Sequence, residues 1–395
     1  MLASNPPLPP EATTRFTRDL TALAPAPTPD RPLAIAVSGG PDSMALLALA
    51  TAAFPDSVIA ATVDHRLRAA SVDEALMVAD WCHTRAIRHA TLWPEKPPAG
   101  ASLQAQARHA RYALLADWAL AAGASALATA HHADDQAETF LMRAARASGP
   151  AGLAGIRPRW EFDASRWRGD TPRPESAPRT QTPLQTRSAA SPQTSPQRRL
   201  GSPRDERTAN QPEDPSLRWG DVQGAEDRPL PIVRPLLTWR RAELRTLATS
   251  LPFIDDPSNT DPRHDRTAAR TLLAAGHLDP LALAAAAAHC REVDAALTET
   301  VDWLWRTRAL PAEPGEHRLD TTDLPRELRR RLARRAIGDV RLIDGITEGR
   351  WSDAANIESL LDALETGGKA TQAGILASAK AGIWHFRPAP PRRSD

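Results

Sequence analysis

The chain has 395 residues, of which 42% are hydrophobic and 25% charged, as in an ordinary globular protein of two or three domains. Its 49 basic and 48 acidic residues leave a formal net charge of +1, so net charge predicts no polyanionic partner. No run of about 18 apolar residues occurs, so we expect no membrane association, and the N-terminus lacks a secretory signal pattern. Cys82 and Cys290 are too few for a disulfide scaffold or a cysteine-ligated metal, and we expect a cytoplasmic protein.

Arginine dominates the basic residues. Only Lys96, Lys369 and Lys380 are lysine, so 46 of the 49 basic residues are arginine. Alanine and proline are also abundant, which is the bias that GC-rich codons produce. Arginine content alone is therefore poor evidence of RNA binding, although the guanidinium group suits phosphate well.

The first part of the chain alternates between strands and helices. Residues 1–30 are rich in proline and read as an N-terminal arm. Strands are then predicted at 33–37, 58–63, 90–92 and 126–130, and helices at 43–53, 72–86, 102–122 and 133–146. This alternation predicts a doubly wound parallel α/β domain over residues 31–250.

The rest of the chain is less regular. Residues 160–229 hold many prolines and few large apolar residues, which predicts a low-complexity, poorly packed insertion within the α/β domain. Beyond it, alanine- and leucine-rich helices predict a helical domain over residues 251–320. Residues 321–395 contain a basic helix, another helix and a loosely alternating, strand-like stretch over 373–386, which predicts a small C-terminal α/β domain.

The strongest motif follows the first predicted strand and precedes a helix. It reads Ser38-Gly39-Gly40-Pro41-Asp42-Ser43. Glycines allow a close backbone approach, and the N–H groups at the start of the helix point into the loop, so the segment predicts a phosphate cradle. It is neither a Walker A loop nor a G-x-G-x-x-G turn. A structural turn would explain the glycines but not the acid, so Asp42 is expected to bind Mg²⁺ that bridges it to phosphate.

Two further segments place polar residues at the carboxyl ends of strands, where open α/β sheets bind ligands. Asp64 and His65 follow the second strand in Val63-Asp64-His65-Arg66-Leu67-Arg68. The fourth strand is followed by His131-His132-Ala133-Asp134-Asp135-Gln136-Ala137-Glu138-Thr139. Its acids predict a pocket for a cationic amine. Helix capping and a His/Asp metal site are the alternatives.

Several arginines are candidate contacts for anions. Arg108 and Arg111 share one helix face and could hold a carboxylate or a phosphate, or simply be solvated. The helix Arg326–Arg335 carries six arginines, and we expect Arg330, Arg331 and Arg334 to contact an RNA backbone if the helix is more than a solvated face.

Together these motifs resemble the tRNA(Ile)-lysidine synthases, a family of N-type ATP pyrophosphatases. The resemblance extends to Arg234-Pro235-Leu236-Leu237, to Arg241, and to the pair Arg266 and Arg270. One departure is Ala147, which stands where the family's R-G-S-G pattern has its first glycine. A tRNA thiolase is the rival within the superfamily, but both cysteines lie outside the motifs.

The resemblance implies ligation of L-lysine to C2 of cytidine 34 in tRNA(Ile) with a CAU anticodon, through an adenylated intermediate formed from ATP with Mg²⁺. The loop, Asp64 and His65 would bind the nucleotide, and Asp42, Asp134, Asp135 and Glu138 would be catalytic. The resemblance assigns the substrate to Arg108, Arg111, His132, Asp134 and Glu138, and tRNA to Arg234, Arg241, Arg266, Arg270, Arg330, Arg331 and Arg334. The C-terminal domain is expected to contact tRNA, and a homodimer is one candidate for the quaternary state.

Overall fold

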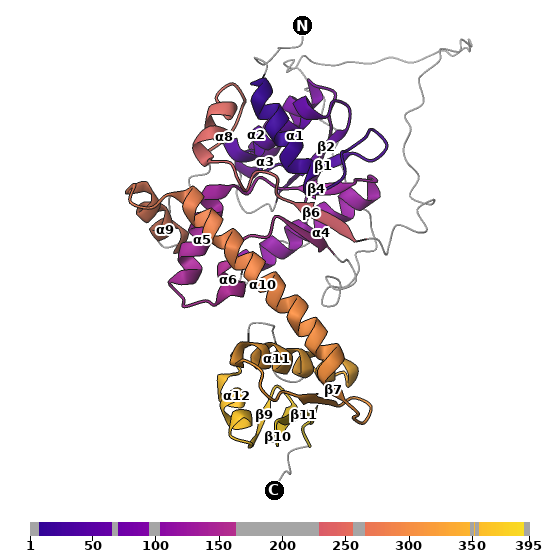
Figure 1. Ribbon diagram of the computed structural model, residues 1–395. Coiled ribbons are helices and arrows are strands. Elements are labelled where there is room, and N and C mark those ends of the chain that lie inside the picture. Colours follow the sequence, from indigo (N-terminus) through magenta and orange to yellow (C-terminus); the bar gives the residue numbers. More distant parts are fainter. Residues whose placement is uncertain are drawn as a thin grey trace, which may run out of the picture. The chain divides into compact units, whose positions relative to one another are not determined.

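A computed structural model describes residues 8–64, 70–94, 103–162, 229–255, 265–347, 351 and 355–390. The chain divides into two compact units (Figure 1). The first unit comprises residues 1–146 and 155–285, and the second comprises residues 147–154 and 286–395. Within the described ranges, no helix combines the length and the apolar character needed to cross a membrane.

The first unit is built on a six-stranded sheet in the order β3-β2-β1-β4-β6-β5. Its strands are β1 (Leu33–Ala36), β2 (Val58–Val63), β3 (Arg88–Leu92), β4 (Ala126–Ala128), β5 (Arg159–Phe162) and β6 (Leu230–Val233). All neighbours pair in parallel except β5, which runs antiparallel to β6 at the edge. The doubly wound parallel sheet predicted from the sequence is confirmed.

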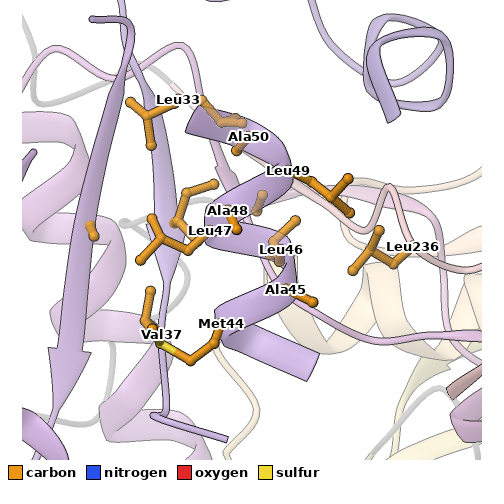
Figure 2. Close-up of a cluster of buried hydrophobic side chains, with 14 of the residues drawn as sticks. Leu33, Val37, Met44, Ala45, Leu46, Leu47, Ala48, Leu49, Ala50 and Leu236 are labelled. Carbon is orange, nitrogen blue, oxygen red and sulfur yellow. The ribbon is translucent and has the colours of Figure 1, made fainter. Parts of the chain in front are cut away.

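The helices of this unit are α1 (Pro10–Thr21), α2 (Pro41–Ala53), α3 (Ala70–His83), α4 (Leu103–Ala121), α5 (Ala133–Ala144), α8 (Arg241–Ala248) and α9 (Asp265–Ala274). Helix α2 is apolar on every side, so it must be enclosed. Figure 2 shows its leucines beside Leu33 and Val37 on one side and Leu236 on the other. This enclosure fixes the start of α2, and with it the preceding glycine loop.

The N-terminal residues differ from the expected arm, because residues 10–21 form helix α1 within the first unit. Its proline stands at the first helical position, where no hydrogen bond is lost. Phe16 and Leu20, spaced by one turn, are fully buried in the core. Asp19 on the same helix accepts a hydrogen bond from the indole N–H of Trp239 at 3.0 Å.

The strand order brings two distant segments together. From β1 the chain passes to β2 and β3 on one side, and α4 then returns it to β4 on the other side of β1. Strands β1 and β4 are therefore neighbours, and the connections that leave their carboxyl ends diverge. Such a point of reversal is where open α/β sheets bind ligands.

The second unit contains an antiparallel sheet in the order β7-β8-β11-β10-β9. Its strands are β7 (Ala309–Leu310), β8 (His317–Asp320), β9 (Lys369–Gln372), β10 (Ile375–Lys380) and β11 (Ile383–Pro388). Its helices are α6 (Pro150–Leu153), α11 (Arg326–Ile343), α12 (Glu358–Glu365) and the larger part of α10 (Pro280–Arg308), which begins in the first unit. Apolar residues of α10, α11 and α12 pack with one face of the sheet. The insertion predicted at 160–229 lies mostly outside the described residues, although residues 160–162 belong to β5.

Candidate active site

The glycine loop after β1 is held by its two serines. The hydroxyl of Ser43 accepts a hydrogen bond from the backbone N–H of Ser38 at 3.2 Å and donates to the carbonyl of Gly40 at 2.9 Å. Gly39 has a φ of 83°, a left-handed conformation that a side chain would strain. Gly40 caps α2, and Pro41 occupies its first turn. The loop thus places the unpaired N–H groups of α2 at the carboxyl end of β1.

Asp42 and His132 connect the loop to the segment that follows β4. The carboxylate Oδ2 of Asp42 lies 3.4 Å from Nε2 of His132, although ninety residues separate them. The other oxygen, Oδ1, is buried and has no hydrogen-bond partner among the described residues. A buried carboxylate oxygen without a donor is a site for a proton or a cation. The adjacency of β1 and β4 produces this contact.

His132 also caps helix α5. Its Nδ1 accepts a hydrogen bond from the backbone N–H of Asp135 at 3.3 Å, and the carboxylate of Asp135 accepts from the backbone N–H of His132 at 3.2 Å. The neutral form protonated on Nε2 satisfies both this cap and the contact with Asp42. Burial opposes a positive charge on the ring, but the hydrogen bond to Asp42 and the charges of Asp135 and Asp42 raise the pKa of His132 overall.

Asp134 is engaged by the start of helix α8. Its carboxylate accepts hydrogen bonds from the backbone N–H of Arg241 at 2.7 Å and from Nε of Arg240 at 3.2 Å. Burial favours its neutral form, but these donors lower the pKa of Asp134, so it is ionised. A carboxylate at a helix N-terminus is stabilised by the helix dipole. Asp134 therefore fixes α8 against α5.

Glu138 is engaged by helix α9. Its side chain is only 2% exposed, and its Oε1 lies 2.7 Å from Nε of Arg270. Its Oε2 lies 3.6 Å from Nε of Arg266, one turn earlier on the same helix. Arg266 and Arg270 therefore both contact Glu138, the last acid of the H-H-A-D-D-Q-A-E-T segment, and these three charges hold α9 against α5.

A cavity of about 460 Å³ opens beside these residues. It is lined by Arg108, Tyr112, His131, Thr139, Arg143, Gly155, Ile156, Arg157, Trp160, Arg234 and Arg266. Five of these residues are arginines and none is an acid. Such a lining favours an anion, and the ring of Trp160 adds an apolar wall.

Burial and mutual repulsion set the charges around the cavity. Arg234 is 4% exposed, and burial lowers its pKa from the usual value. One of its terminal nitrogens donates to the hydroxyl of Tyr112 at 3.3 Å. His131 is kept neutral, since burial and the nearby arginines lower its pKa well below the usual range. The arginines remain charged because guanidinium does not lose its proton in proteins, so the cavity is cationic.

The structure brings most of the expected site residues into the first unit. The loop, Asp64 at the end of β2, and the acids of α5 all belong to it, whereas His65 lies outside the described residues. Arg108 and Arg111 both lie over the ring of Tyr112. Arg330, Arg331 and Arg334 belong to the second unit and already have intramolecular partners.

Sequence reasoning missed several cavity residues. Tyr112 was not singled out, and its position one residue after Arg111 was the available signal. Arg143, Arg157 and Trp160 carried no recognisable pattern. The metal site considered for the two histidines finds no support, because the described residues contain no group of three or more potential ligands.

Comparisons with known proteins identify the family of this chain. A family model for the PP-loop domain matches residues 12–174. A tRNA(Ile)-lysidine synthase from Novosphingobium aromaticivorans is 38% identical over 387 residues, covering 97% of this chain and 96% of the relative. The chain belongs to the tRNA(Ile)-lysidine synthase family. Another member, from Zymomonas mobilis, is 35% identical over 91% of this chain and 89% of its own length.

A PP-loop domain implies ATP binding, and the matched residues include the glycine loop Ser38–Ser43. Among solved structures, a U34-tRNA thiolase, NcsA from Methanococcus maripaludis, is 13% identical, with a TM-score of 0.45 over 71% of this chain and 78% of that chain. The thiolase alternative gains nothing from the cysteines of this chain, since Cys82 is a buried free thiol on α3 and Cys290 is a free thiol on α10.

Proposed function

We propose that this protein ligates L-lysine to C2 of cytidine 34 in the CAU anticodon of tRNA(Ile), using ATP and releasing AMP and pyrophosphate. Family membership over nearly the whole chain supports this proposal. The observation that supports it at the atomic level is the contact of Asp42 with His132, which joins the glycine loop to the H-H-A-D-D-Q-A-E-T segment. We further expect the reaction to take place in the cytoplasm.

The first half of the reaction attaches AMP to the cytosine O2. That oxygen is a poor leaving group, and adenylation turns it into part of a stable anion while making C2 electrophilic. The loop N–H groups and the serine hydroxyls would hold the phosphates of ATP as charge develops on pyrophosphate. Asp64 at the end of β2 and His65 would border the nucleotide.

Mg²⁺ fits this site because Asp42 offers a buried oxygen, Oδ1, with no hydrogen-bond donor among the described residues. Magnesium prefers carboxylate oxygens and phosphate. When bound, it would supply positive charge to the leaving pyrophosphate. His132, whose Nε2 faces the other oxygen, would orient the Asp42 carboxylate.

The second half needs a neutral amine. A lysine ε-amine has a pKa of about 10.4, so only about one molecule in 2,500 is uncharged at pH 7. The acids Asp134, Asp135 and Glu138 would bind the ammonium group and accept its proton as the C–N bond forms. Asp134 and Glu138 have arginine partners, whereas the carboxylate of Asp135 accepts a hydrogen bond from the backbone N–H of His132. Among the described residues, Asp135 is thus the acid of the three that is not paired with an arginine.

The cationic cavity would hold the negative groups of the substrates. Arg108, Arg234 and Arg266 line it, and Arg111 stacks near Tyr112 at its edge. A guanidinium group pairs equally well with a carboxylate and with a phosphate, so the lysine carboxylate and an anticodon phosphate are both suited to this cavity. Arg241 and Arg270, on the helices fixed by Asp134 and Glu138, would contact tRNA alongside it.

Pyrophosphate release tests the proposal. With ATP, Mg²⁺ and tRNA(Ile) carrying the CAU anticodon, we expect adenylation and release, and with lysine added we expect lysidine by mass spectrometry of the digested tRNA. Asp42→Asn should abolish release, whereas Asp56→Asn, an exposed aspartate at the opposite end of β2, should not change it. Pyrophosphate release that is indifferent to tRNA, or no lysidine from the wild type, would overturn the proposal.

A further inference from the structure

The sheet of the second unit has one face that the helices of that unit do not cover. Side chains alternate along its strands, and Leu319, Ala377 and Trp384 point into the core with α11 and α12. The strand register assigns the opposite positions to a second face, which we call the open face. One row across it joins Arg318, His385, Ser378 and Lys369 on β8, β11, β10 and β9.

Cations gather on the open face. Lys369, Lys380 and Arg387 are exposed, and no carboxylate of the described residues lies within ion-pair distance of them. Arg318 donates a hydrogen bond to the carbonyl of Pro311 at 3.0 Å, which leaves its charge uncompensated.

The acids beside the open face already have partners. Asp320 pairs with Arg308 at 3.1 Å, and Glu316 pairs with His385 at 2.6 Å. The charge of Asp320 is thus offset by Arg308, and the four cations outnumber the remaining carboxylate, Glu316. The open face presents a net positive surface about 14 Å wide, which is three spacings between neighbouring strands.

Helix α11 is not a comparable surface, despite its six arginines. Arg326 is paired with three acids, and Arg330 with two of its neighbours' acids. Arg331 lies 2.7 Å from Asp294. A guanidinium already neutralised by a carboxylate releases few counterions when a phosphate approaches, and binding there would break existing pairs. On α11, Arg334 has only the carbonyl of Ala355 as a partner, whereas four cations of the sheet lack a carboxylate partner in the described part of the chain. Among the described residues of these two elements, the larger unpaired positive charge therefore lies on the sheet.

The composition of the open face selects the kind of partner. None of the large apolar side chains exposed by the described residues belongs to this sheet, so the face does not suit insertion into a lipid surface. The aromatic rings of Trp384 and Phe386 point into the core, so none is offered for stacking on a base. Besides the half-buried Leu376 and Ile383, the open face carries two lysines and two arginines with the hydroxyl of Ser378 among them. Such cations and hydroxyls bind sugar and phosphate.

We propose that the open face binds the sugar–phosphate backbone of tRNA, independently of sequence and outside the anticodon. This inference rests on the proposed function for the identity of the RNA. It replaces α11 with the sheet as the RNA-binding element of the C-terminal domain, with Lys369, Lys380 and Arg387 as its principal contacts.

The test measures tRNA affinity of the full chain by fluorescence anisotropy over a series of KCl concentrations. Lys369→Gln/Lys380→Gln should weaken binding roughly tenfold at low salt and reduce the slope of log K against log salt by about 1 for each lysine. Lys369→Arg/Lys380→Arg, which keeps both charges, should bind as the wild type does. This pair of variants separates charge from folding.

A matched control removes two charges elsewhere. Arg31→Gln/Arg88→Gln alters exposed arginines at the amino ends of β1 and β3, at the sheet edge opposite the glycine loop, and should leave the salt slope unchanged. The inference would be overturned if Lys369→Gln/Lys380→Gln bound tRNA with the affinity and salt slope of the wild type. It would also be overturned if this variant lost binding to anionic vesicles while its binding to tRNA was unchanged. Lysidine formation at saturating tRNA is measured separately, so failure of the proposed function is distinguishable from failure of this surface.

Discussion

The ion pair between Glu138 and Arg270 gives a quantitative test of how α9 is held. Glu138 is 2% exposed and Arg270 is 25% exposed, with 2.7 Å between Oε1 and Nε. Surface pairs contribute about 0–1 kcal/mol, whereas removing one partner of a buried pair costs about 3–5 kcal/mol. The partial exposure of Arg270 places their coupling between these limits, at about 2 kcal/mol. Glu138→Gln alone should cost more, about 3 kcal/mol, because it also leaves Arg266 without its acid.

The assay is a double-mutant cycle of Glu138→Gln and Arg270→Met, read by hydrogen–deuterium exchange of peptides from α5 and α9. Local exchange isolates the docking of α9 from global unfolding. The matched control is the pair Arg245 and Asp255, which is as short, at 2.6 Å, but has side chains that are 45% and 58% exposed. We expect its coupling to stay below about 1 kcal/mol. Equal coupling energies in the two pairs would refute the argument that burial sets the strength of the α9 contact.

The same variants separate two roles for Glu138. If its main role is to hold α9, Glu138→Gln and Arg270→Met should reduce lysidine formation by similar factors. If it binds the lysine ammonium group directly, Glu138→Gln should raise the KM for lysine more than Arg270→Met does.

Two further predictions concern stability. Ala147 has a φ of 52°, a left-handed conformation that costs a non-glycine residue about 1–2 kcal/mol. Ala147→Gly should therefore stabilise the chain by about 0.5–1 kcal/mol, once the greater freedom of glycine in the unfolded chain is subtracted. A lower unfolding midpoint in urea would contradict this prediction. Burial lowers the pKa of His89 to about 4. The unfolded chain, with a His pKa of about 6.5, therefore takes up the proton first, and stability should fall by up to about 3 kcal/mol as pH drops from 6.5 to 4. Replacement by the non-titrating His89→Gln should flatten this part of the pH profile, and an unchanged profile would show that other groups cause the loss.

The features that the sequence could reveal are local ones. Apolar runs such as Val58–Val63 identified the strands of the parallel sheet, and the loop and the two histidines were recognised at the ends of β1 and β4. The alternation of strands and helices was enough to place both motifs at one edge of the sheet. Ala147 was also informative, since the position where the family has glycine is one where the backbone adopts a positive φ.

Features that depend on contacts between distant residues were not accessible. The proline-rich surroundings of residues 10–21 concealed α1, whose stability comes from burying Phe16 and Leu20 rather than from its own sequence. The ion pairs of the arginines of α11 were not predictable, because several of their partners, such as Asp294, lie more than thirty residues away. The acids of α5 looked free for the same reason, since the arginines that engage Asp134 and Glu138 come from α8 and α9.

The edge hairpin of the first unit bears on how the chain tolerates its long insertion. Phe162, the last residue of β5, is the register partner of Leu230, the first residue of β6. The chain therefore leaves the sheet and re-enters it at adjacent points on its outermost rim. Material can be added or removed between these points without any strand changing its neighbour, so the length of this segment is decoupled from the architecture that carries out the chemistry.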